Sequence, residues 1–138
     1  MDEIDYKILK GLEKNARISI TELAHKVSMS SPSVRERIIR LEEQKIIEGY
    51  TTNINYKKLG KSLEAFILVE TNRCKSFRNF CQCHSIIKEF YRLAGKYSYL
   101  VRVSVQSIET LESFIDEIQR FGNSSTQIVF SSFRKSIL

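Results

Sequence analysis

Early in the chain, the start signals of two helices follow one another closely. Ser19 and Glu22 form a capping box, in which the side chain of each residue can bond to the other's backbone N–H. Ser31 suits an N-cap, and Pro32, the only proline of the chain, suits the first helical position. A short helix, a tight serine-rich turn and a second capped helix predict a helix-turn-helix at about residues 20–39.

Apolar spacing predicts one more helix before this motif and a small hairpin after it. Apolar residues from Ile4 to Leu12 recur at helical spacing, and Asp2 stands before them as a cap. Residues 46–55 contain β-branched side chains around a glycine, which indicates a two-stranded wing. Residues 1–55 are therefore expected to form a winged helix-turn-helix domain.

The start of the third helix carries side chains that favour a nucleic-acid interface. In a helix-turn-helix, this helix enters the major groove and its first residues meet base edges. The candidate DNA-binding residues are Ser31, Ser33, Arg35, Arg37 and Arg40. Their hydroxyl and guanidinium groups can bond to phosphates and to guanine edges. Arg37 and Arg40 point away from the apolar stripe of this helix, so we expect that removing them weakens DNA binding and leaves stability nearly unchanged. A three-helix bundle whose arginines only solvate one face is the alternative.

The second half of the chain changes to strand periodicity. Strands are predicted at 63–71, 87–94, 97–105 and 127–133, and helices at 76–84 and from Ser107 to Gly122. The apolar stripe of the later helix is Ile108, Leu111, Phe114, Ile115 and Ile118. The core face of the third strand is Tyr99, Val101, Val103 and Val105. This order predicts an α+β fold, with a ferredoxin-like βαββαβ sandwich at 63–138 and a linker at 56–62.

Composition and motifs exclude several classes of protein. The 138 residues carry a net charge of +6, which permits a polyanionic partner without establishing one. Three cysteines and an acidic N-terminus without an apolar signal indicate a reduced, cytoplasmic protein, and the apolar run Ala65–Val69 is too short for a membrane span. Cys81 and Cys83 are two apart on a predicted helix and cannot face one metal ion. Since no catalytic constellation is visible, we expect a protein that is not an enzyme and that needs no metal or cofactor.

Several segments together resemble one known family. They are Ala16-Arg17-Ile18-Ser19, Glu22-Leu23-Ala24, Arg40-Leu41-Glu42-Glu43, Ile46-Ile47, Gly49-Tyr50-Thr51, Leu59-Gly60, Ala94-Gly95 and Tyr99-Leu100-Val101. In these segments the chain resembles the Lrp/AsnC family of bacterial and archaeal transcription regulators. The resemblance implies a cytoplasmic regulator that binds double-stranded DNA through its N-terminal domain. It also implies that the sandwich assembles homodimers or octamers and commonly binds an amino acid between dimers.

The chain departs from the family pattern at positions that affect these expectations. Ser28 and Lys45 stand where the family usually has glycine, and a non-glycine residue at a left-handed cap costs roughly 1 kcal/mol. The loop Gly95-Lys96-Tyr97-Ser98-Tyr99 corresponds to the effector loop that the resemblance implies, where the family often has acidic residues at the positions of Lys96 and Ser98. Because an α-ammonium group needs acceptors, we expect common free amino acids to bind weakly or not at all.

Two other functions stay open at the level of sequence. One is an effector-independent, DNA-organising protein of the same fold. The other is a small-molecule-sensing domain without direct DNA function, which would show no salt-dependent binding to a duplex.

Overall fold

The computed structural model describes residues 1–135 of the chain, which divides into two compact units. The first unit comprises Met1–Asn53 and the described part of the segment that begins at Phe133, and the second comprises Ile54–Ser132. Each unit has a hydrophobic core of its own. No helix in the described part of the chain has the length and apolar character needed to cross a bilayer.

Three helices make up the first unit: α1 (Glu3–Lys14), α2 (Ile20–Val27) and α3 (Ser31–Glu43). Each places its apolar stripe on a shared core, which consists of Ile8, Leu23, Ala24, Val27, Val34, Ile38 and Leu41. The predicted helix-turn-helix is therefore confirmed as α2 and α3.

The caps of these helices follow the expected chemistry with one shift. The Asp2 side chain accepts a bond from the Asp5 backbone N–H, and Ser19 accepts one from that of Glu22. The N-cap of α3 is Ser30, whose side chain accepts a bond from the Ser33 N–H at 3.3 Å, so the prediction of Ser31 is wrong by one residue. In a run of serines, the residue that keeps extended backbone angles becomes the cap, and Ser30 has φ −73° and ψ 150°.

Ser28 and Lys45 both adopt the left-handed conformation that the missing glycines suggest. Their φ angles are 55° and 57°. After α3, the Lys45 N–H bonds to the carbonyl of Glu42 and the Ile46 N–H bonds to that of Leu41, which is the Schellman pattern. Both positions therefore carry the conformational cost that the sequence predicts.

The predicted wing does not form strands. Residues 46–55 contain no strand pairing, and Ile46, Ile47 and Tyr50 line a shallow depression beside Leu9 and Leu12 of α1. An isolated two-stranded hairpin is marginal in water, and packing of this segment against α1 takes the place of pairing.

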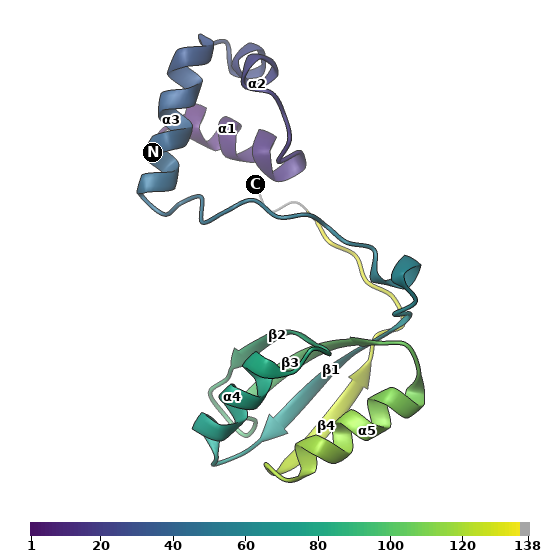
Figure 1. Cartoon of the computed structure of the whole chain (residues 1–138). Coiled ribbons are helices and arrows are strands. Elements are labelled where there is room, and N and C mark those ends of the chain that lie inside the picture. Colours follow the sequence, from purple (N-terminus) through teal and green to yellow (C-terminus); the bar gives the residue numbers. More distant parts are fainter. Residues whose placement is uncertain (136–138) are drawn as a thin grey trace. The chain divides into compact units, whose positions relative to one another are not determined.

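The second unit is a four-stranded antiparallel sheet with two helices. The strands are β1 (Leu63–Glu70), β2 (Ile87–Arg92), β3 (Tyr99–Val105) and β4 (Asn123–Ile128), in the spatial order β2-β3-β1-β4. The helices are α4 (Cys74–Cys83) and α5 (Ile108–Gln119), and a 3-10 turn, η1 (Tyr56–Leu59), precedes β1. The element order confirms the predicted βαββαβ fold (Figure 1).

Both helices of this unit cover the same face of the sheet. Phe77 of α4 and Phe114 of α5 lie in one core with Ile67 of β1 and Val101 of β3, and all four are fully buried. The predicted core face of β3, from Tyr99 to Val105, is confirmed. In α5, however, Ile108 is exposed, because it lies in the first turn, ahead of the part of the helix that covers the sheet.

The last strand lies earlier in the chain than predicted. Apolar residues favoured 127–133, but β4 is the polar segment Asn123–Ile128, while Phe130 and Phe133 are exposed. β4 is an edge strand that pairs with β1 alone, so its position depends on that partner and not on its own apolar pattern.

Candidate functional site

The N-terminal half of α3 presents polar side chains on one side and core residues on the other. Val34 and Ile38 are buried, whereas Arg35 is exposed and makes no ion pair with any described residue. Ser31 and Ser33 are half-buried, and the Ser33 hydroxyl lies 2.8 Å from that of Ser30. Arg35 is therefore the candidate arginine with a guanidinium group fully available to an external anion.

Arg37 is held by two carboxylates of α1. Its Nη1 lies 2.7 Å from Oδ1 of Asp5 and 2.8 Å from Oδ2 of Asp2, and only 19% of its side chain is exposed. Arg40 approaches the same Asp5 oxygen at 3.3 Å, but half of its side chain is exposed. Asp5 is 1% exposed and closes the α1 capping box by accepting a bond from the Asp2 N–H at 3.0 Å.

This cluster of Asp2, Asp5, Arg37 and Arg40, which we call the α1–α3 ion cluster, keeps its acidic groups charged. Burial raises the pKa of Asp5, but hydrogen bonds from the Asp2 backbone and from Arg37 outweigh it, so the pKa lies below its usual value. The hydrogen bond from the Asp5 backbone, with Arg37 second, lowers the pKa of Asp2 to about 2. The cluster joins the start of α1 to the middle of α3.

The expectation that Arg37 and Arg40 can be removed with stability nearly unchanged takes no account of this cluster. Removal of Arg37 would leave the buried Asp5 carboxylate without its shortest cationic contact. Sequence reasoning missed this partner, because a spacing of 32 residues between Asp5 and Arg37 carries no local signal. The available signal was Asp5 itself, which is three residues after the Asp2 cap and on the apolar side of α1.

The candidate effector loop has both structural and accessible residues. Tyr99 is fully buried, and the Ser98 hydroxyl donates a 2.8 Å hydrogen bond to the Thr71 carbonyl, so both are tied into the fold. Gly95 has φ 114° and turns the chain between β2 and β3, and the Lys96 ammonium lies 5.6 Å from the centre of the Tyr97 ring. Of the five loop residues, Lys96 and Ser98 line one pocket, whereas Gly95, Tyr97 and Tyr99 are not part of its lining.

A shallow pocket of about 480 Å³ lies beside this loop. Lys96 and Ser98 line it together with Glu70, Thr71, Asn72, Phe121, Gly122 and Asn123. Glu70 is the one carboxylate among these lining residues, and it was not a sequence candidate. Gly122 is required here, because a Cβ at that position would lie 2.0 Å from the Glu70 carbonyl oxygen. The pocket is thus lined by one negatively charged side chain, Glu70, and one positively charged side chain, Lys96.

Comparison with known proteins identifies both units. Residues 1–42 match the AsnC-type helix-turn-helix domain, and residues 64–137 match the Lrp/AsnC ligand-binding domain. The chain belongs to the Lrp/AsnC family. It is a DNA-binding, helix-turn-helix transcriptional regulator of that family.

Relatives of this Lrp/AsnC regulator match along nearly their whole length. The uncharacterized HTH-type transcriptional regulator YezC of Bacillus subtilis is 42% identical over 132 residues, which cover 96% of this chain and 95% of YezC. The transcriptional regulator LrpC of the same organism is 33% identical over 133 residues, 95% of this chain and 92% of LrpC. The solved LrpC structure has a TM-score of 0.93 and covers 99% of both chains at 31% identity.

A further solved structure contains a ligand. The feast or famine regulatory protein of M. tuberculosis, complexed with L-methionine, has a TM-score of 0.88 at 25% identity and covers 99% of this Lrp/AsnC chain and 97% of its own. The resemblance predicted from the sequence is therefore confirmed.

Proposed function

We propose that α3 is the element that reads DNA and that Arg35, with Ser31 and Ser33, contacts the duplex. The exposed guanidinium of Arg35, beside a core-facing stripe that fixes the helix, carries this proposal. Arg40 contributes its exposed half to phosphates, and Arg37 acts as a positioning residue that holds α3 against α1. The first 55 residues are then the DNA-binding domain, which acts on cytoplasmic DNA without enzymatic chemistry.

Footprinting on the region upstream of the protein's own gene tests this function. Two protected half-sites about one helical turn apart are expected from two symmetry-related recognition helices. Absence of any protected region, at protein concentrations where light scattering shows intact assemblies, would contradict a DNA-reading role.

Assembly is proposed through the sheet face that the helices leave uncovered. Phe66 and Leu68 of β1 and Leu100 of β3 lie on that face and are only half-buried in the single chain, and Tyr91 of β2 is 49% exposed beside them. These four side chains form an apolar patch beside the ion pairs of Arg102 with Glu64 and Glu89 on the same face, and an apolar patch with polar neighbours is typical of an interface. A second copy fits it, because a two-fold axis would place the same residues against each other. The sandwich at 63–138 is then the assembly domain.

Light scattering of Leu68→Asp tests the assembly face. We expect monomers with an unchanged circular dichroism spectrum, whereas Ser113→Asp on the exposed side of α5 keeps the assembly of the unaltered protein. An assembled Leu68→Asp protein would exclude this face.

The pocket beside the 95–99 loop is the proposed effector site. Glu70 and Lys96 both line it, so the α-ammonium group of a free amino acid finds a single acidic acceptor beside one positive charge. Weak binding of common amino acids follows. Calorimetric titration with the twenty amino acids, repeated on Lys96→Asp, tests this. Ser98 stays unaltered, because its hydroxyl holds Thr71. Micromolar binding of a neutral amino acid to the unaltered protein would contradict the expectation.

A further inference from the structure

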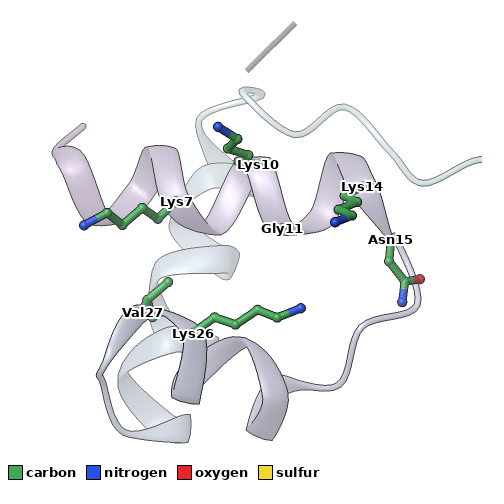
Figure 2. Close-up of a pocket in the computed structure, with 7 residues that line it drawn as sticks. All are labelled: Lys7, Lys10, Gly11, Lys14, Asn15, Lys26 and Val27. Atoms are coloured by element: carbon green, nitrogen blue, oxygen red, sulfur yellow. The ribbon is translucent and has the colours of Figure 1, made fainter. Parts of the chain in front are cut away.

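A basic groove lies between α1 and α2, and neither the recognition helix nor the effector loop contributes to it. Its volume is about 470 Å³, and its lining consists of Lys7, Lys10, Gly11, Lys14, Asn15, Lys26 and Val27. Figure 2 shows Lys7, Lys10 and Lys14 along α1 and Lys26 on α2, and in this view the Lys10 side chain extends to the side of α1 away from α2. We call this site the lysine groove.

The lysine groove carries excess positive charge. Lys7 and Lys26 pair with Glu3 and Glu22, each at 2.8 Å and each more than half exposed. Lys10 and Lys14 form no ion pair with any residue among those that the structure describes, and no acidic residue lines the groove. Exposed pairs contribute little binding energy, so Lys7 and Lys26 can exchange their glutamates for a stronger anion.

The floor of the groove depends on Gly11. A Cβ at this position would lie 2.7 Å from Cδ1 of Leu23, so glycine lets α1 and α2 pack closely. The aliphatic parts of the lysine side chains flank this contact. Favourable interaction with helix C-termini accounts for Lys14 and Lys26, which lie in last turns. It does not account for Lys7 and Lys10, which lie further from the C-terminus of α1.

We propose that the lysine groove binds a free multivalent phosphate anion of the size of pyrophosphate or a nucleoside triphosphate. Compact ammonium groups are established phosphate ligands, and several of them around one concavity favour an anion of several charges over a monovalent carboxylate. The volume lies in the range of small-molecule sites. A duplex, in contrast, presents its phosphates along an extended rod and does not fill a concavity of this size.

Calorimetry with sodium pyrophosphate and with ATP, in the absence of DNA, tests the proposal on the full chain. We expect one site per chain, and we expect Lys10→Gln/Lys14→Gln to lose about tenfold or more in affinity. The matched control is Lys57→Gln/Lys58→Gln, which removes the same charge from two exposed lysines of η1 and should bind like the unaltered protein. Glutamine is a good helix former, and thermal melts check that both variants are folded.

Changes in the NMR chemical shifts of the backbone amides, followed in the unaltered protein during a pyrophosphate titration, give an independent readout. Shifts centred on Lys10, Gly11, Lys14 and Lys26 support the proposal. Equal losses in both double variants would indicate only diffuse charge and would overturn it. A third outcome is that neither pyrophosphate nor ATP binds, and that Lys10→Gln/Lys14→Gln alone binds a duplex more weakly. This outcome would assign the groove to DNA and would also overturn the proposal.

Discussion

Arg37 shows how a single residue joins the start of α1 to α3. Its guanidinium contacts Asp2 and Asp5, while Arg35, two positions earlier, faces outward. We therefore predict that Arg37→Ala lowers the midpoint of thermal unfolding by several degrees, because the buried Asp5 loses its shortest cationic contact. Arg35→Ala is the control and should melt like the unaltered protein. Thermal unfolding is followed by circular dichroism. Equal midpoints for all three proteins would show that the α1–α3 ion cluster contributes nothing to stability.

The same cluster predicts a response to acid. Because the pKa of folded Asp2 is about 2, below its ordinary value of 3.8, its stabilising effect is complete above that ordinary value and is lost as the pH falls towards 2. Denaturant unfolding between about pH 5 and pH 2 should show a steeper loss for the unaltered protein than for Asp2→Asn. Other carboxyl groups titrate in both proteins, so the difference isolates Asp2. Parallel pH curves would contradict the assigned pKa.

Two more residues adopt a left-handed backbone conformation that lowers the stability of the fold. Ser28 and Lys45 hold φ angles of 55° and 57°, which glycine adopts without steric penalty. We predict that Ser28→Gly and Lys45→Gly each raise the free energy of unfolding by about 0.5–1 kcal/mol in denaturant titrations. Lys10→Gly, inside α1, should instead lower it by about 1 kcal/mol. A loss of stability in either cap variant would mean that the native side chain contributes more than the backbone conformation costs.

At the scale of elements, β3 is the strand on which the second unit depends. It lies between β2 and β1, and Val103 is fully buried at its centre. Val103→Asp places an unpaired charge in the core, and we predict a loss of more than about 3 kcal/mol, enough to unfold this unit. Ser113→Asp, at an exposed position of α5, should be tolerated. Hydrogen exchange of the β1 and β3 amides distinguishes the two outcomes, and full protection in Val103→Asp would contradict the assigned face.

Elements with local signals were predictable, and elements that depend on distant partners were not. Ser19 and Ser107 cap helices through bonds to residues three positions away, so short sequence patterns are sufficient to find α2 and α5. The polar strand β4 is defined by pairing with β1, more than fifty residues earlier, and its apolar neighbours misled the prediction. The candidate site divides in the same way: Arg35 follows from its place on α3, whereas the partners of Arg37 and the pocket residue Glu70 come from other elements.

At the scale of the whole molecule, we propose that the two units divide two tasks. In this proposal the helix-turn-helix unit presents α3 to DNA, and the sandwich brings copies of α3 together through its uncovered sheet face. Binding should then depend on salt, because phosphate neutralisation releases counterions and supplies much of the affinity. The contribution of each arginine can be read from the slope of affinity against salt.

The most direct test is the anisotropy of a labelled duplex from the region upstream of the protein's own gene, titrated over a series of salt concentrations. Three proteins are compared: the unaltered chain, Arg35→Ala on α3, and Arg78→Ala on the exposed side of α4 as a control for the loss of one charge. We predict that Arg35→Ala binds more weakly at every salt concentration, by about 1–3 kcal/mol if Arg35 contacts a guanine, or with a slope reduced by about one per phosphate contact. Arg78→Ala should match the unaltered chain. Identical curves for all three proteins would contradict the claim that α3 reads DNA.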